Sequence, residues 1–314
     1  MLNVVTRRLL SLVPVIFLVT LVAFFLQVLM GGNAALALAG MNATPAEIAQ
    51  IQQQEHLSEP PYVRYWYWLD GALHGHLGIS YATQRPVTSE LAHYFPVTAS
   101  LTIAALVLIV VIGVPLGILQ GMRAGSAVDK GLLGFVSVAI SAPGFWVGTM
   151  LVFLLAVKVK VFPALGYVPF QQSPVEWATH IFLPALTLAL GGFGIIARFL
   201  RTGIVGVSNE DFVRALHARG LSKRRISYKH VLKNASLSTI TILGLNIGFL
   251  LSGAVIVEQI FTLPGMGTYA LTSIQTRDSP AIEGVILTTA IVIMLVNLLT
   301  DVTYSYLNPK VRLS

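Results

Sequence analysis

The chain has 314 residues, of which 55% are hydrophobic and only 11% are charged, and this apolar fraction exceeds what a soluble core requires. Cysteine is absent, which excludes disulfides, thiolate metal sites and cysteine nucleophiles. The net charge of +7 does not require nucleic acid as a partner, because the placement of Lys and Arg follows membrane topology. We therefore expect an all-α polytopic membrane protein.

Six apolar runs of about 20 residues are long enough to cross a bilayer core of roughly 30 Å. No Asp, Glu, Lys or Arg lies inside their apolar bodies; Glu258 and Glu283 lie at span edges. Each of the first four runs contains a proline that is expected to kink its helix. The first run is longer than the roughly 7–15 residues of a signal peptide, so it is expected to remain as a span. The predicted spans are 9–31, 98–121, 131–157, 178–197, 236–257 and 283–304.

Basic residues predict the orientation of these spans, because cytoplasmic loops carry an excess of Lys and Arg. With a cytoplasmic N-terminus, 15 of the 20 Lys and Arg lie on the cytoplasmic side, and both termini are cytoplasmic. The expected organisation is the N-terminus and first span over 1–31, an extracytoplasmic segment over 32–97, and a five-helix core over 98–314.

The outer segment contains a predicted helix and an aromatic stretch. Thr44 suits the N-cap and Pro45 the first helical position, so a helix is expected from there to about His56, ending before Pro60. The aromatic stretch has two interpretations: a belt of rings at the membrane interface, or a docking face for an external partner. It consists of Tyr62, Tyr65, Trp66, Tyr67 and Trp68.

Residues 208–234 form a dense polar block, with seven Lys or Arg between the fourth and fifth spans. Ser208 is the expected N-cap of a helix over about 209–219, and Gly220 is the expected helix stop. The apolar residues of this helix share one face by 3-and-4 spacing and predict a knob for a groove on a soluble protein. They are Phe212, Val213, Ala215 and Leu216.

A second helix is predicted over about 223–234, with Ser222 as its cap. Basic residues surround its apolar positions, and on charge alone the block is equally compatible with a loop attracted to anionic lipid. The caps and the glycine stop favour a folded helix–turn–helix that binds a cytoplasmic partner.

Most positions of this block are in register with a known pattern, as are several segments outside it. The block resembles the cytoplasmic EAA loop of binding-protein-dependent ABC importer permeases, in the dipeptide, oligopeptide and nickel branch. It departs from the general EAA pattern at Arg214, Leu216, His230 and Lys233, where Glu, Ala, Ile and Pro are usual. The matching residues are Glu210, Asp211, Phe212, Val213, Arg214, Ala218, Gly220, Leu221, Arg225, Ile226, Lys229, His230, Val231, Leu232, Lys233, Asn234 and Ala235. Similar matches occur at 143–146, 162–164, 183–189, 258–267 and 308–312, and the outer stretch with 77–80 resembles the B-type subunit of the permease pair.

The resemblance implies a type I ABC importer permease fold and a location in the bacterial inner (plasma) membrane. It implies a transport subunit that forms half of a pathway for dipeptides or oligopeptides. The implied partners are a second homologous permease in a heterodimer, two ABC ATPase subunits, an extracytoplasmic substrate-binding protein and membrane lipid. The residues implied to couple to the ATPase are Glu210, Asp211, Phe212, Val213, Arg214, Ala215, Leu216, Ala218, Arg219, Gly220, Leu221 and Ser222.

No catalytic residue, metal site or cofactor is predicted in this chain. It lacks the G-x-x-x-x-G-K-[ST] pattern that cradles nucleotide phosphates, so ATP and Mg²⁺ are expected on the partner ATPase subunits. His74 and His76 have the spacing of a metal pair, but polar loop histidines are more often solvated.

Four polar or aromatic residues in the spans are candidates for facing the translocation path, although a polar span residue as often bonds a neighbouring helix. They are Trp146, Asn246, Ser252 and Asn297. An ion-coupled carrier is disfavoured, because such carriers keep ionisable residues inside their spans, and an intramembrane hydrolase lacks its buried pair. The substrate stays open among dipeptide, oligopeptide, glutathione, nickel chelate and haem.

Overall fold

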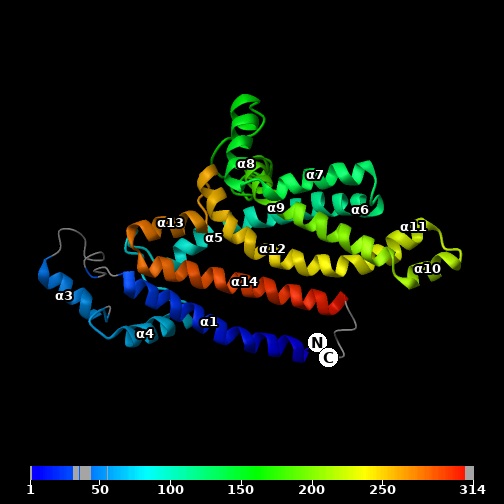
Figure 1. Ribbon diagram of the computed structural model, residues 1–314. Coiled ribbons are helices and arrows are strands. Elements are labelled where there is room, and N and C mark those ends of the chain that lie inside the picture. The colour runs from blue at the N-terminus through cyan, green and yellow to red at the C-terminus, as the bar shows by residue number, and fades with distance from the viewer. Residues whose placement is uncertain (1, 31–34, 36–43, 55, 308–314) are drawn as a thin grey trace. The chain divides into compact units, whose positions relative to one another are not determined.

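The computed structural model describes residues 2–30, 35, 44–54 and 56–307 (Figure 1). Within these residues the regular secondary structure is helical, with one isolated bridge between Ile79 and Pro86. Three π-helical segments continue α5, α8 and α11: η1 (Ile109–Gly113), η2 (Val152–Lys158) and η3 (Ile226–Val231). The α-helices are α1 (Leu2–Met30), α3 (Pro45–Gln54), α4 (Pro61–Leu73), α5 (Val87–Leu108), α6 (Val114–Met122), α7 (Ala127–Ser141), α8 (Gly144–Leu151), α9 (Pro174–Ser208), α10 (Asp211–Ala218), α11 (Lys223–Arg225), α12 (Leu232–Phe261), α13 (Met266–Thr276) and α14 (Ser279–Leu307). The all-helical prediction is confirmed.

Helices lie at all six predicted ranges, and several of them are long and apolar enough to cross a membrane. Helix α1 covers the first range as far as Met30, and its apolar part runs over Leu10–Phe25. The bent pair Ala127–Ser141 and Gly144–Lys158 passes the same test when taken as one span. Four pass it alone: Val87–Met122, Pro174–Ser208, Thr239–Phe261 and Ser279–Thr300.

The third predicted span is a broken helix, whereas a single kinked helix was expected. Its two parts meet at an angle of 100°. The residue before a proline is driven out of the helical region by the proline ring, and Ala142 accordingly has φ −70° and ψ 129° before Pro143. Pro14 and Pro184 lie inside uninterrupted helices, so a proline alone does not decide where a span breaks.

Helices α12 and α14 extend beyond the predicted spans, and each contains a buried glutamate. Helix α12 continues to Phe261 and α14 begins at Ser279. Glu258 and Glu283, which the sequence placed at span edges, therefore lie within helices that qualify as spans. Their exposed fractions are 0% and 7%. Because both acids lie inside helical segments that pass the span test, the expected absence of ionisable residues from the spans no longer argues against an ion-coupled carrier.

The chain folds into two compact units. The first comprises Ala99–Leu263 with the chain from Val296 onward, and the second comprises Leu2–Thr98 with Pro264–Leu295. The second unit has an apolar core in which α5, α13 and α14 contribute residues such as Leu91, Tyr269 and Val285. Helix α9 is central to the first unit, where it packs against α6, α7, α8 and α12 (Figure 1).

The predicted helix of the outer segment is present as α3, and its start is confirmed. Thr44 Oγ1 accepts from the backbone N–H of Glu47 at 3.3 Å, and the backbone N–H of Thr44 donates to Glu47 Oε2 at 2.7 Å. This is a reciprocal capping box. The backbone hydrogen bond, and then the hydroxyl of Thr44, lower the pKa of the Glu47 carboxyl.

The aromatic stretch lies on α4, and one of its rings is structural. Tyr65 is 1% exposed, and its hydroxyl lies 2.9 Å from Thr20 Oγ1 on α1. Tyr62, Trp66 and Tyr67 are exposed. Tyr65 thus anchors α4 to α1. The exposed rings fit both a belt at the membrane interface and a docking face, so both interpretations stay predictions.

Candidate coupling surface and transport path

The fourth span runs directly into the polar block. Helix α9 is 35 residues long and ends at Ser208, whose hydroxyl donates to the carbonyl of Ile204 at 2.6 Å. Ser208 therefore closes α9 and does not cap α10, so the predicted cap is wrong. The N-cap of α10 is Glu210, which forms no side-chain cap hydrogen bond. A one-residue turn at Asn209 separates α9 from the cap, so a displacement of the end of α9 is passed to α10.

The predicted stop of α10 is confirmed. Gly220 has φ +79°, a left-handed conformation that glycine adopts without strain. The backbone N–H of Leu221 reaches back to the carbonyl of Leu216 at 3.3 Å, as in a Schellman motif. Both leucines also pack against the same apolar cluster. The turn after α10 is therefore fixed by glycine conformation, hydrogen bonding and apolar contact together.

The apolar face of α10 is turned into the protein. Val213 is 3% exposed and packs with residues of α9, η3 and α12; this coupling cluster consists of Leu200, Ile204, Val213, Ile226, Val231 and Ala235. Leu216 is half-buried against it. Val213 and Leu216 are thus not available as the tip of a knob, and that prediction is wrong. Phe212, which is 42% exposed, and Ala215 remain on the open side.

The second helix of the block begins as predicted but does not end as predicted. Ser222 Oγ accepts from the backbone N–H of Arg225 at 3.4 Å, which confirms the cap. The chain then stays helical through α11, η3 and α12, since Arg225 and Val231 at the junctions have helical backbone angles. The separate helix over 223–234 is instead the first part of one helical run from Lys223 to Phe261.

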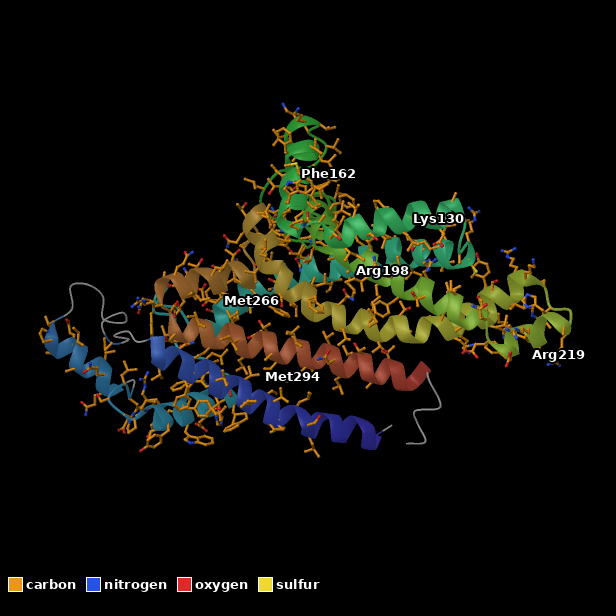
Figure 2. All side chains as sticks on the ribbon, viewed as in Figure 1. Lys130, Phe162, Arg198, Arg219, Met266 and Met294 are labelled. Carbon is orange, nitrogen blue, oxygen red and sulfur yellow. The ribbon has the colours of Figure 1, made fainter. Side chains whose placement is uncertain are left out.

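The exposed side of the block is strongly basic. Figure 2 shows polar side chains gathered on α10 and α11, with Arg219 labelled among them. The ion pair between Arg214 and Asp211 has an N–O distance of 3.4 Å and is open to solvent. An open pocket of about 380 Å³ lies on α11 and η3, and it is lined by Ser222, Arg224, Arg225, Tyr228 and Lys229. The surface offers the exposed rings of Phe212 and Tyr228 together with several cations.

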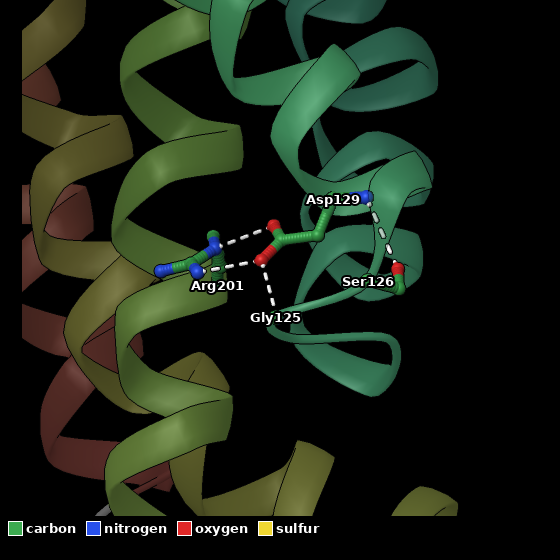
Figure 3. A network of polar contacts seen from close by, with 4 residues as sticks. All are labelled: Gly125, Ser126, Asp129 and Arg201. Atoms are coloured by element: carbon green, nitrogen blue, oxygen red, sulfur yellow. Dashed lines mark hydrogen bonds and ion pairs between the residues drawn. The ribbon is translucent and has the colours of Figure 1, made fainter.

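A bidentate ion pair ties α9 to the start of α7 (Figure 3). Arg201 Nε and one terminal nitrogen each lie 2.7 Å from a different carboxylate oxygen of Asp129. Asp129 is 1% exposed, and it also accepts from the backbone N–H of Gly125 at 2.8 Å. The backbone N–H of Asp129 in turn donates to Ser126 Oγ, the N-cap of α7. The loop between α6 and α7 is thereby fastened to the helix that leads into α10.

A stripe of glycines at the end of η1 and on α6 was missed in the sequence, although Gly113, Gly117 and Gly121 have the spacing of a small-residue contact face. A Cβ on Gly117 would lie 2.9 Å from the carbonyl oxygen of Ala197. A Cβ on Gly121 would lie 2.7 Å from the side chain of Ile204. The glycines therefore let α6 approach the backbone of α9 closely, and α9 is packed tightly against α6.

One of the four predicted path residues, Asn246, lines a cavity of the first unit. A mainly apolar cavity of about 380 Å³ is bordered by α8, α9 and α12, and Asn246 lines it together with Thr187, Gly192 and Gly253. Trp146, Ser252 and Asn297 are exposed residues outside its lining. Within the described residues no group of three His, Cys, Asp or Glu side chains could hold a metal ion.

Two families match nearly the whole chain. Residues 113–313 match the family described as the inner membrane component of binding-protein-dependent transport systems. Residues 1–102 match the N-terminal family of the same membrane components.

Individual proteins align over almost their full length. A protein named as a peptide transport system permease of Brucella abortus (strain 2308) is 32% identical over 308 residues, 98% of each chain. A glutathione transport system permease protein of Escherichia coli O6:H1 is 35% identical over 312 residues, 99% of each chain. The solved structure of the MetNI methionine ABC transporter in an inward-facing conformation has a TM-score of 0.56 at 16% identity, covering 69% of this chain and 96% of that chain. At that identity the likeness concerns the fold alone.

Proposed function

The chain belongs to the inner membrane components of binding-protein-dependent transport systems, and it is a permease subunit of an ABC importer; from this premise we propose that it imports dipeptides or oligopeptides and is driven through α10. The proposed assembly pairs it with a second homologous permease in a heterodimer. Two ATPase subunits bind on the cytoplasmic side, where both chain termini lie, and a substrate-binding protein docks on the opposite side of the bacterial inner membrane.

The anchoring of α10 is the observation that carries the coupling role. Its inner face packs into the coupling cluster, while Phe212, Arg214 and Arg219 point away from it. The turns at both ends of α10 are short, so α10 is closely connected to α9 and to the helical run that continues into α12. A partner that binds these exposed side chains and moves α10 therefore also moves α9 and α12. ATP-driven movement of the ATPase subunits then biases the importer between two conformations through differential contact.

The peptide substrate is supported by the name of the Brucella relative, and glutathione is a second candidate because the Escherichia relative carries that name at 35% identity. Peptides and glutathione carry the same kinds of charged and amide groups, so the same translocation pathway could carry either substrate. Uptake of labelled dialanine, a longer peptide and glutathione into proteoliposomes with the whole assembly separates them. Transport of none of the three, with ATP hydrolysis still stimulated by the binding protein, would overturn the peptide assignment.

The coupling role is tested with Phe212→Asp in the purified assembly. We expect the stimulation of ATP hydrolysis by the binding protein to fall at least about tenfold, because the largest exposed apolar side chain of α10 becomes a charge. Phe212→Leu is the matched control, because it keeps an apolar side chain at the same exposed position. Wild-type stimulation in Phe212→Asp, or an equal loss in Phe212→Leu, would contradict the role of α10.

A further inference from the structure

The second unit contains a cavity that neither the coupling surface nor the path accounts for. Its volume is about 280 Å³, close to the lower end of small-molecule sites, which begins near 300 Å³. Residues of α1, α4, the 74–81 loop and the start of α14 line it. Aromatic rings form much of the wall, from Phe24, Tyr67, Trp68 and Tyr81.

Glu283 of α14 lines this cavity with an uncompensated carboxylate. It is 7% exposed, and no hydrogen bond or ion pair joins it to another residue in the described part of the chain. The Glu283 oxygens are not among the fully buried polar atoms that lack a hydrogen-bond partner. The small exposed part of the side chain therefore includes the carboxyl group. A buried carboxylate without a partner is costly unless a cation neutralises it or it takes up a proton.

Positive charge lies across the same cavity. The Arg64 guanidinium acts electrostatically on Glu283, although the two are too far apart for an ion pair. The guanidinium carbon lies 6.0 Å from the ring centre of Phe24, which holds it at the wall. His56 and His76 also line the cavity, and the ring of His56 stacks on Tyr67 with centres 4.3 Å apart. The lining therefore presents a buried carboxyl group and a cation to the same space.

The walls are held in place by contacts outside the lining. Asp278, at the start of α14, accepts from the backbone N–H groups of Tyr81 and Ala82 at 3.1 and 3.2 Å, and from the hydroxyl of Ser80. This fastens the 74–81 loop to α14. The hydroxyl contact between Tyr65 and Thr20 fastens α4 to α1. A site whose walls are fixed before binding loses little freedom when a ligand enters.

We propose that this cavity binds a small zwitterionic amine, of amino-acid to dipeptide size, with its ammonium at the Glu283 carboxylate and its own carboxylate toward Arg64. Aromatic walls favour the ammonium, because a cation is attracted to the face of a ring. The site is separate from the apolar cavity at Asn246, which offers no charged side chain. It binds whether or not ATP is hydrolysed, so it stands apart from the proposed coupling role.

The experiment measures binding of labelled dialanine to the purified assembly in nanodiscs by equilibrium dialysis, without binding protein or nucleotide. In Glu283→Gln we expect binding to weaken at least about tenfold, because a charge-assisted hydrogen bond is lost. Glu90→Gln is the matched control: Glu90 is also 7% exposed in the second unit, but it lies outside the cavity and faces Arg85.

If Glu283→Gln fails to assemble, the proposal is tested on the unaltered protein by measuring how well small molecules displace labelled dialanine. Unlabelled alanine should displace dialanine, whereas N-acetylalanine, which has no ammonium, and alanine amide, which has no carboxylate, should displace it at least about tenfold less well. Equal binding in Glu283→Gln, equal competition by N-acetylalanine, or no saturable binding to the unaltered assembly would overturn the proposal. Loss of dialanine binding in Glu90→Gln to the same extent would also overturn it.

Discussion

Replacing Asp129 by Asn should destabilise the protein far more than the loss of one surface charge. The carboxylate accepts from two nitrogens of Arg201 and from the backbone N–H of Gly125. An Asn side chain of the same shape offers one acceptor and turns an NH₂ group toward the remaining donors. Since Asp129 is 1% exposed while the Arg201 side chain is 23% exposed, water can rescue the arginine only in part. We expect a loss of about 2–3 kcal/mol in unfolding free energy.

The free energy of unfolding is measured by SDS titration of the protein in mixed micelles. Asp211→Asn is the control. Because the Asp211 side chain is 96% exposed, its ion pair with Arg214 should contribute less than about 0.5 kcal/mol to the free energy of unfolding. In a double-mutant cycle, Asp129→Asn with Arg201→Gln should show a coupling energy of about 1.5 kcal/mol or more. Additive effects of the two changes, or a loss no larger than that of Asp211→Asn, would refute the reasoning.

Two further predictions concern glycines. Gly117→Val should lower the unfolding free energy by about 1–3 kcal/mol, because its Cβ meets the α9 backbone at 2.9 Å; Gly131→Val, where no atom lies within 4 Å of the added Cβ, should lack this overpacking cost in the same titration. Gly220→Val should abolish the stimulation of ATP hydrolysis by the binding protein while the chain still inserts into the membrane, because a β-branched residue is strained at φ +79°. Gly206→Ala, inside α9 with open space around its Cβ, should leave that stimulation intact, and a Gly220→Val assembly with normal stimulation would contradict the role of this turn.

Glu258 and Glu283 show how small errors in helix length change a functional argument. The predicted fifth span ends one residue before Glu258 and the sixth begins at Glu283, so both acids counted as lying at span edges, and an ion-coupled carrier was disfavoured on that ground. Helix α12 continues to Phe261 and α14 begins at Ser279, so both acids lie inside helices, where they are 0% and 7% exposed. Hydropathy marks where a helix can cross lipid, but it does not mark where the helix ends.

The sequence determined what depends on neighbours along the chain. The capping box at Thr44, the cap at Ser222 and the stop at Gly220 are confirmed because each is set by residues within about four positions. The positions of the helices followed from runs of apolar residues. The register of the polar block with the EAA pattern also pointed to the family before any coordinates.

Only the tertiary structure decided which surfaces are covered and which distant groups meet. Periodicity showed that Val213 and Leu216 share an apolar face with Phe212, but the packing of α9, η3 and α12 decided that the first two turn inward. Asp129 and Arg201 are 72 residues apart, and their pairing depends on how α7 packs against α9. A helical repeat identifies a face of a helix, but what that face contacts is fixed by the fold as a whole.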